Sequence, residues 1–223
     1  MGEVKMNTIK NLLKKENNIA IIGGAGCGKG IVFKSILSDL VSSNKKVLVL
    51  EPSGGKEYKQ ITDSFGGNHI FYKSMNNIDY NNNLTTISFS KDNQCPEIEL
   101  ILRILKGAEN NGVEVVLIDE AWNYLKDCAK INTNINVQLI INTQFDTDIL
   151  GNENSTSFKN LFRTLFLMGK NNYNIHYTYP KLLALYNIDK SVIEYLKTQG
   201  YFESIIIREN EIIEKNFKIE IEK

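Results

Sequence analysis

The sequence predicts an α/β fold with a mainly parallel central sheet, which is flanked by helices and followed by a C-terminal β-hairpin. Short runs of Ile, Val and Leu recur without polar alternation, and such runs are typical of strands buried on both faces of a parallel sheet. Longer stretches with helical spacing of apolar residues lie between these runs, and this alternation is typical of α/β proteins. Near the end of the chain, two β-rich runs flank Glu209 and Asn210, which indicates a hairpin.

The alternation assigns strands and helices in chain order. Parallel strands are expected at 19–22, 47–50, 113–118, 137–141 and 164–168. Helices are expected between them at 29–41, 96–109, 121–129 and 157–163. In the helix at 96–109 the apolar residues repeat at spacings of three and four, Pro96 suits its first turn, and the "NNG" that follows suits its end.

Two segments follow a different pattern. Residues 65–90 are rich in turn formers, and we interpret them as turns with one or two short strands at one edge of the sheet. A further helix is expected over 189–200, with Asp189 as its cap and Gly200 as its terminator.

The ends of the chain complete the domain. Residues 1–17 are expected to form a lead-in helix, and 200–223 the C-terminal strands. No internal repeat or low-complexity linker divides the sequence, so residues 1–223 are interpreted as a single domain.

Composition excludes several classes of protein. Hydrophobic residues make up 42% of the 223 residues, which is enough for a packed core. Lysine and arginine together number 26, as do aspartate and glutamate, so the net charge is zero and does not support a nucleic-acid partner, although DNA stays open. The 3 cysteines show no metal-site or disulfide spacing, which indicates a reducing compartment. No apolar run approaches the roughly 18 residues of a membrane span, so a cytoplasmic protein is expected, with membrane association only through partners.

A glycine-rich loop follows the first strand. The stretch "GGAGCGK" fits the phosphate-loop pattern G-x-x-x-x-G-K, between a predicted strand and a predicted helix. Glycines let successive backbone N–H groups surround phosphate oxygens, and the helix N-terminus favours negative charge. We therefore expect the loop to bind ATP, with Lys29 reaching the β and γ phosphates; the alternative is a glycine-rich turn without a ligand. The residues expected to contact the nucleotide are Gly23, Gly24, Ala25, Gly26, Cys27, Gly28, Lys29, Gly30 and Ile31.

Two positions of the loop are unusual. The Ser or Thr that normally follows the lysine and binds Mg²⁺ is replaced by Gly30. The metal would then depend on water, the phosphates and a carboxylate from elsewhere in the chain. Cys27 is interpreted as a small residue that fills space, with a redox-sensitive thiol as the alternative.

Two later strand ends supply polar side chains. The apolar run "VEVVLI" ends at Asp119, which is expected to bind Mg²⁺, and Glu120 follows as a candidate general base for the attacking water. The alternative is that both acids begin a helix, where acids are favoured. The next apolar run ends in Thr143 and Gln144, and the glutamine is expected to contact the γ-phosphate or the water; the alternative is a strand-end cap.

Taken together, the motifs resemble the ATPases of conjugative type IV secretion systems. The resemblance rests on "DEAW" after one strand, "TQ" at the end of the next, "EPSGGKEY" after the second strand, and "YNIDKSVIEYLKTQGYFESIIIRE" near the C-terminus. It covers nearly the whole chain but only the C-terminal motor portion of that family. It implies a RecA-like phosphate-loop NTPase, often hexameric, whose partners are copies of itself and proteins of the secretion or conjugation machinery at the inner membrane.

The resemblance also implies roles for single residues. Lys29 corresponds to the phosphate-binding lysine, Asp119 to the metal acid, Glu120 to the catalytic acid and Gln144 to the sensor. Many relatives place an arginine–lysine pair before the "TQ" strand, whereas this sequence has only lysines there. Arg163 is therefore the candidate finger toward a neighbouring subunit, with a solvated helix end as the alternative. The helical insertion of the family is reduced to little more than 96–109.

Three functions stay open at this point. The first is an ATPase that energises secretion or conjugative transfer. The second is a nucleotide-binding accessory subunit with little turnover, which Gly30 and the scarcity of arginine favour. The third is a DNA translocase or packaging ATPase of the same superfamily, against which the neutral charge counts.

Overall fold

The computed structural model describes most of the chain. The described residues are 18–52, 56–72, 78–89, 97–121, 125, 130–131, 135–144, 155–170 and 175–218, without the side chains of 176–178. The expected helices at 1–17 and 121–129, and Pro96, lie outside these residues or almost entirely so.

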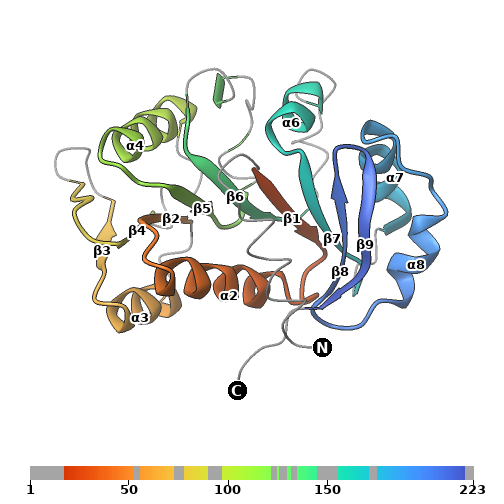
Figure 1. The fold of residues 1–223 in the computed structure, drawn as a ribbon, viewed down its shortest axis with the longest axis horizontal. Helices are drawn as coiled ribbons and strands as arrows, with labels where there is room; N and C mark the ends of the chain where they lie inside the picture. The colour runs from red at the N-terminus through yellow and green to blue at the C-terminus, as the bar shows by residue number, and fades with distance from the viewer. Residues whose placement is uncertain are drawn as a thin grey trace.

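A nine-stranded sheet runs through the molecule in the order β3-β4-β2-β5-β6-β1-β7-β8-β9 (Figure 1). The strands are β1 (Ile19–Gly23), β2 (Val47–Glu51), β3 (Asn68–Phe71), β4 (Leu84–Ser88), β5 (Val115–Ile118), β6 (Gln138–Thr143), β7 (Thr164–Met168), β8 (Glu203–Arg208) and β9 (Glu211–Lys218). All pairings from β3 to β7 are parallel, and β8 and β9 are added antiparallel. The predicted fold class is confirmed.

Helices cover both faces of the sheet. They are α2 (Lys29–Ser42), α3 (Lys56–Ser64), α4 (Ile98–Asn110), α6 (Ser155–Leu161), α7 (Ile175–Leu185) and α8 (Val192–Thr198). α2 and α3 lie on one face, α4 and α6 on the other, and α7 and α8 lie beside the C-terminal strands (Figure 1). The inner strands β2, β5, β6, β1 and β7 bury alternate side chains in two apolar cores, because successive residues point to opposite faces. Ile19 and Ile21 of β1 face α2, whereas Ala20 and Ile22 face the opposite core.

Several predicted bounds are wrong by a few residues. β5 begins at Val115 rather than at 113, and the carboxylate of Glu114 before it accepts hydrogen bonds from the Lys45 ammonium and the Lys46 N–H. β6 extends to Thr143, which pairs with Ile22 of β1. α6 ends at Leu161 rather than at 163.

The segment 65–90 was predicted only in part. It contains β3 and β4, but only β3 lies at the sheet edge. β4 is fully buried between β3 and β2. The sequence pattern also missed two helices, α3 and α7, and α7 contains Pro180, a residue that normally interrupts a helix.

The C-terminal part agrees with the prediction apart from the helix bounds. α8 begins at Val192, and Asp189 caps the turn before it by accepting the Ser191 N–H at 2.8 Å. Glu209 and Asn210 both have positive φ, 50° and 76°, as the two-residue turn of a right-twisted hairpin requires. Within the described residues, no helix is long and apolar enough to cross a membrane.

Candidate nucleotide site

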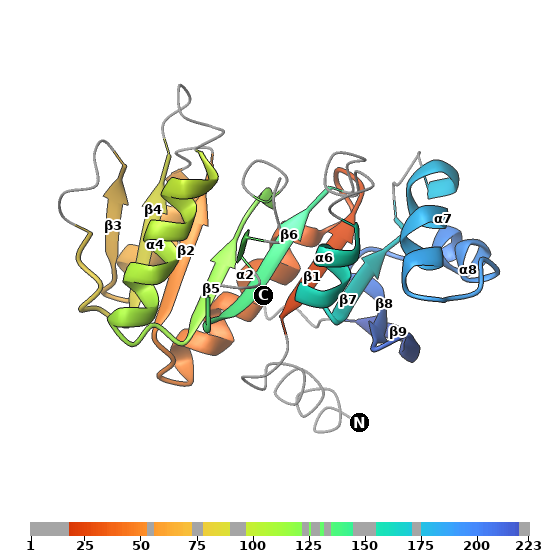
Figure 2. The same ribbon diagram turned by 90° about the horizontal axis from the view of Figure 1, so that it is seen from above.

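The predicted polar residues meet at one edge of the sheet. β5, β6 and β1 are adjacent and parallel, so their carboxyl ends lie together (Figure 2). Ile118 pairs with Ile141 and Ile22 pairs with Thr143, which places Asp119, Gln144 and the phosphate loop at this edge. Ligands of open α/β sheets bind beyond the carboxyl ends of the strands.

The phosphate loop leads directly into α2. Gly26 and Gly28 have φ values of 72° and 102°, which most side chains avoid, and they turn the chain from β1 into the helix. The loop directly precedes the N-terminus of the 14-residue helix α2, which is the positive end of its dipole. No acidic residue in the first turn offsets this charge. Lys29 is 6% exposed, and its ammonium donates to the Gly24 carbonyl oxygen at 2.9 Å. The loop therefore combines a cation, a helix terminus and glycine backbone, as anion binding requires.

Cys27 packs inside the loop. Its side chain is fully buried, and a Cβ added at Gly23 would lie 2.7 Å from its Sγ. Burial raises the pKa of the thiol above its ordinary value, although the nearby Lys29 charge lowers it. A protonated, buried thiol is a poor nucleophile, so the geometry favours the space-filling interpretation over the redox one.

The structure leaves open space around Gly30. A Cβ added there meets no heavy atom within 4 Å, and its φ is not in the left-handed region. The structure therefore has room for a serine or threonine side chain at this position.

Replacing Gly30 by serine is expected to keep the fold and to raise the free energy of unfolding by up to about 1 kcal/mol, because glycine loses more backbone entropy in a helix. The added hydroxyl is also expected to lower the Mg²⁺ concentration needed for ATP binding. Urea unfolding and a Mg²⁺ titration measure both effects. Gly112→Ser is the matched control, since that site is equally open but has a φ of 73° and should lose stability. Loss of stability at Gly30 would contradict this description of the loop.

The Asp119 carboxylate is held by hydrogen bonds to both of its oxygens. The Tyr58 hydroxyl of α3 donates to Oδ2 at 2.7 Å. The Asn142 amide of β6 donates to Oδ1 at 2.7 Å, and the Glu120 N–H donates to the same oxygen at 3.0 Å. Donors from α3, from β6 and from the backbone of the next residue therefore fix the orientation of the Asp119 carboxylate.

Burial governs the electrostatics of this acid. Burial raises the pKa of Asp119, the Tyr58 hydrogen bond lowers it, and the Glu120 charge raises it further. Burial and the Asp119 charge raise the pKa of Tyr58 well above its ordinary value, so the phenol stays protonated and acts as the donor. Asn142 Oδ1 is buried and has no hydrogen-bond partner among the described residues, so it leaves one acceptor at the site.

Tyr58 and Asn142 were missed from the sequence. Asn142 breaks the apolar run of β6, and a polar residue inside a buried strand was a signal. Tyr58 gave none, because its contact with Asp119 depends on how α3 packs against the sheet.

Replacing Tyr58 by phenylalanine is expected to lower the free energy of unfolding by about 1.5–3 kcal/mol, since a buried carboxylate oxygen loses a charge-assisted hydrogen bond. Tyr80→Phe is the matched control, because the Tyr80 hydroxyl donates to a neutral carbonyl, Ile104 O, at 3.1 Å. Its loss is expected to be about 0.5–1.5 kcal/mol. Equal losses in urea unfolding would argue against a hydrogen-bonded Asp119 carboxylate.

Two other predicted residues lie at the same edge. Glu120 has a φ of 47°, so the chain turns sharply directly after Asp119. Gln144 is exposed, and its carbonyl accepts the Thr143 hydroxyl at 2.8 Å, which orders the strand end.

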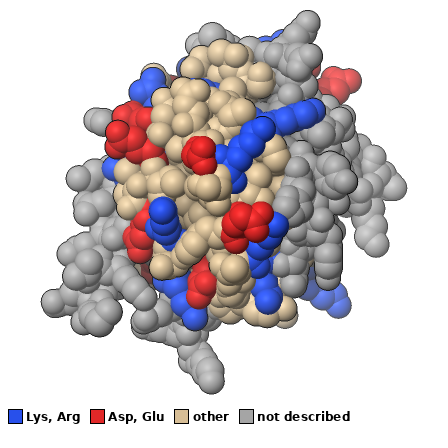
Figure 3. Space-filling model, turned by 90° about the vertical axis from the view of Figure 1, so that its right-hand side faces the viewer, with Lys and Arg blue, Asp and Glu red and all other residues tan. Residues whose placement is uncertain are grey.

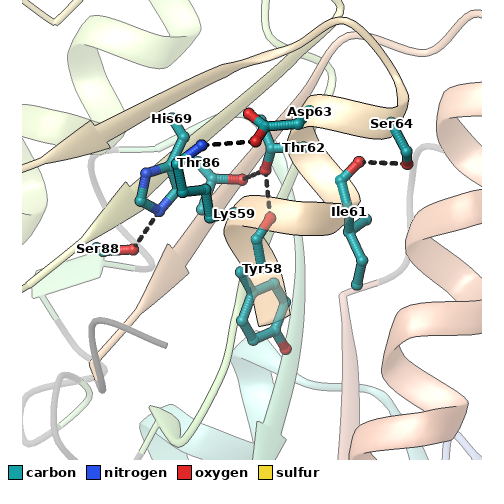
Figure 4. A network of polar contacts seen from close by, with 9 residues as sticks. All are labelled: Tyr58, Lys59, Ile61, Thr62, Asp63, Ser64, His69, Thr86 and Ser88. Atoms are coloured by element: carbon teal, nitrogen blue, oxygen red, sulfur yellow. Dashed lines mark hydrogen bonds and ion pairs between the residues drawn. The ribbon is translucent and has the colours of Figure 1, made fainter. Parts of the chain in front are cut away.

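A polar network anchors α3, the helix that carries Tyr58 (Figure 4). Thr62 donates to or accepts from Thr86 of β4 at 2.7 Å and bonds to the Tyr58 carbonyl oxygen at 2.7 Å. His69 of β3 contacts Ser88 of β4 at 2.8 Å, and Ser88 donates to the fully buried Glu51 at the end of β2. The Thr62–Thr86 bond ties α3 to β4 and so helps to place Tyr58 against Asp119, whereas the His69 and Ser88 bonds join the neighbouring strands β3, β4 and β2.

His69 gives this network a dependence on pH. Burial lowers the pKa of its imidazole, and the Lys59 charge adds to this, while Glu51 and Asp63 act in the opposite direction. The pKa of His69 is lower in the folded than in the unfolded protein. The free energy of unfolding is therefore highest above about pH 6.5, and it falls as the pH decreases through the folded-state pKa of His69. His69→Gln is expected to reduce this loss between about pH 8 and pH 5 in urea unfolding. Identical slopes for both proteins would contradict it.

The candidate finger lies at the opposite edge. Thr164 pairs with Ile19 at the start of β1, so Arg163 lies at the amino ends of the strands, about 15 Å of strand away from the loop. It is exposed, and its guanidinium lies 3.6 Å from the Glu209 carboxylate. Arg163 therefore cannot reach the loop of its own chain. Lys126 and Lys130 are the two lysines before the "TQ" strand. Lys130 pairs with Glu99 of α4 at 3.0 Å, and Lys126 lies outside the described residues.

Comparison with known proteins extends the picture. DNA packaging protein OPG160 of Variola virus is 25% identical over 181 residues, covering 72% of this chain and 62% of that protein. The same protein of Vaccinia virus (strain Western Reserve) gives the same values. The chain thus spans less than two thirds of the length of these relatives.

Solved structures share the fold. VirB4 of Thermoanaerobacter pseudethanolicus superposes with a TM-score of 0.70 at 14% identity, covering 92% of this chain and 89% of that one. The genome packaging NTPase B204 of Sulfolobus turreted icosahedral virus 2, in complex with AMPPCP, gives 0.65 at 15% identity, covering 93% and 100%.

The resemblance to type IV secretion ATPases is confirmed at the level of fold by the VirB4 superposition. The family model for the central domain of the helicase HerA matches residues 2–219, almost the entire chain. The protein is therefore a member of the HerA helicase central-domain family.

Proposed function

We propose that the chain is an ATP-hydrolysing motor, formed by residues 1–223 as one domain, that energises the transfer of a macromolecule. The observation that carries the proposal is the Asp119 carboxylate, held by Tyr58 and Asn142 at the edge of the sheet where the phosphate loop begins. A glycine loop and a strand-end acid on neighbouring strands suit a nucleotide with its divalent cation.

The residues fit Mg²⁺ as the cofactor. Asp119 would hold the ion, which when bound neutralises charge on the β and γ phosphates. Among the described residues, no group of three or more His, Cys, Asp and Glu side chains gathers for a metal. One carboxylate suffices for Mg²⁺ in nucleotide sites, because phosphates and water complete its shell.

Four residues of the chain have separate roles in binding and hydrolysing ATP. Lys29 contacts the terminal phosphates, and Glu120 accepts a proton from the attacking water. Gln144, exposed beyond β6, contacts the γ-phosphate or that water. Arg163 acts on a neighbouring copy in a ring, hexameric in the simplest case, because its place at the opposite edge excludes its own loop.

Packaging of DNA is the first candidate role. The curated relatives are DNA packaging proteins, at 25% identity. On the face at the β9 end of the sheet, basic and acidic side chains are interspersed (Figure 3), so this face does not form a basic track for DNA. We therefore place the DNA contact elsewhere, in the channel of the assembled ring.

Conjugative transfer or type IV secretion is the second candidate role. The ordered "EPSGGKEY", "DEAW" and "TQ" motifs favour it. In that role the ring works at the cytoplasmic face of the inner membrane through proteins of the transfer machinery, whereas an accessory subunit would bind ATP with little turnover.

Phosphate release per chain, measured against protein concentration with and without double-stranded DNA, tests the proposal. Turnover should rise steeply with concentration as subunits complete one another's sites, and DNA should stimulate it in a salt-sensitive manner. Turnover that rises but ignores DNA favours the secretion role. ATP binding without turnover at every concentration would overturn the motor and leave the accessory subunit.

A further inference from the structure

An aromatic turn packs directly on the phosphate loop. Tyr201 and Phe202 lie between α8 and β8. A Cβ added at Gly28 would lie 2.6 Å from Cδ1 of the Phe202 ring, so this ring covers the backbone of the loop immediately before Lys29. Segments far apart in sequence thus meet at the nucleotide site.

Two exposed apolar residues belong to the loop helix and to the aromatic turn. Within the described residues the exposed large hydrophobics are Ile31, Phe65, Phe71, Tyr201 and Ile213. Ile31 is 42% exposed on the first turn of α2, where its N–H donates to the Gly28 carbonyl at 3.0 Å. Tyr201 is 50% exposed next to the ring that covers Gly28. One exposed apolar residue therefore follows Gly28 by three positions in the chain, and another adjoins the ring that covers Gly28.

The turn is held in a specific conformation. Phe202 has a φ of 63°, which bulky residues rarely adopt, and such strain is concentrated at ligand-binding sites. Gln199 Oε1 accepts the Gly169 N–H at 2.6 Å, which ties the turn to the end of β7. The Lys170 ammonium lies 5.2 Å from the centroid of the Tyr201 ring, a cation–π contact that holds this ring beside the loop.

The order of the strands says which end of a nucleotide would lie here. The acids Asp119 and Glu120 follow β5, on one side of β1, whereas β7 and β8 lie on the other side. A triphosphate that directs its terminal phosphate toward the acids directs its nucleoside toward β7 and β8. Tyr201 precedes β8 and lies in that direction.

We propose that Tyr201, supported by Phe202 and Lys170 and faced by Ile31, stacks the base of the bound nucleotide. The proposal rests on the proposed function, because it assumes that the loop holds a nucleoside triphosphate. The chemistry matches: the aromatic ring offers a flat apolar surface to a π-system, and the Lys170 ammonium over one face of this ring leaves the other face for the base.

Affinities for two ligands test the stacking role. The wild type, Tyr201→Ala and Tyr201→Phe are titrated with ATP and with tripolyphosphate, which lacks base and ribose, in the presence of Mg²⁺. Tyr201→Ala should lower the affinity for ATP by about 5- to 100-fold and change that for tripolyphosphate by less than about twofold. Tyr201→Phe should retain ATP affinity, because it keeps the ring. Phe71→Ala, 51% exposed on the distant edge strand β3, is the matched control and should bind both ligands as the wild type does.

Each alternative result is distinct. Wild-type ATP affinity in Tyr201→Ala would overturn the stacking role while leaving the ATPase intact. Equal loss of both ligands would show that the substitution deforms the loop and would also overturn it. A wild type that binds neither ligand would remove the proposed function and this inference together, whereas Lys29→Ala, in a protein that binds both, should lose both.

Discussion

ATP turnover is expected to fall by about 10²–10⁴-fold when Glu120 is replaced by glutamine, which is the usual worth of a positioned general base. Glu120 directly follows the hydrogen-bonded Asp119, and its backbone turns with a φ of 47°. Glutamine keeps the length of the side chain and the ability to hydrogen-bond water, but it cannot accept a proton. ATP affinity should therefore change by less than about threefold.

Phosphate release and ATP binding, measured on the same preparation, separate the two quantities. Glu211→Gln on the exposed outer strand β9 removes an equal charge far from the loop and should leave both at the wild-type level. If Glu120→Gln hydrolyses ATP as fast as the wild type, Glu120 is not the base.

Replacement of Lys29 by alanine is expected to weaken ATP binding by about 100-fold or more, because charge-assisted hydrogen bonds to the phosphates are worth about 1.5–3 kcal/mol each. The loop itself should survive. The lysine is 6% exposed and its ammonium bonds only a neutral carbonyl, Gly24 O, among the described residues. Removing a buried cation should not lower the free energy of unfolding, and it should abolish turnover at ordinary ATP concentrations.

Lys190→Ala is the control for this change, since Lys190 is exposed on the turn before α8. Binding by calorimetry and unfolding in urea decide between loss of a contact and loss of the fold. ATP affinity equal to the wild type would mean that the loop is a turn without a ligand, and a large loss of stability would mean that Lys29 is structural.

The parallel sheet could be predicted because its strands are buried on both faces. Ile19–Gly23 and Thr164–Met168 are almost entirely apolar runs, and the glycine that follows each of them, Gly24 or Gly169, marks a carboxyl end. Such runs carry their own signal whatever surrounds them. α7 could not be predicted in this way, because Pro180 argues against a helix and the anchoring contact is tertiary: the Tyr179 hydroxyl donates to the Met168 carbonyl at 2.8 Å.

Part of the candidate site could likewise be predicted from the strands, and part of it depends on tertiary contacts. Lys29, Asp119 and Gln144 were predicted to share one edge because parallel strands align their ends, and the register places them there. Tyr58 and Asn142 act through Asp119, and no spacing in the sequence expresses a contact between α3, β6 and the end of β5. The roles of these residues in turnover stay predictions.

The position of Arg163 shows what register adds. The sequence places it directly before a strand, and the direction of that strand relative to β1 decides the edge of the sheet at which the residue lies. The pairing of Thr164 with Ile19 puts it at the amino edge, so any action on a nucleotide must be on that of a neighbour. A contact of this kind depends on a second copy and is beyond the reach of one chain's sequence.

Calorimetric titration of the wild type with ATP in Mg²⁺ tests the central claim most directly, namely that the loop at Gly23–Lys29 holds a triphosphate. The account predicts about one ATP per chain, with affinity lost when Mg²⁺ is removed by chelation. Absence of ATP binding at millimolar nucleotide, in a protein that unfolds cooperatively in urea, would contradict it.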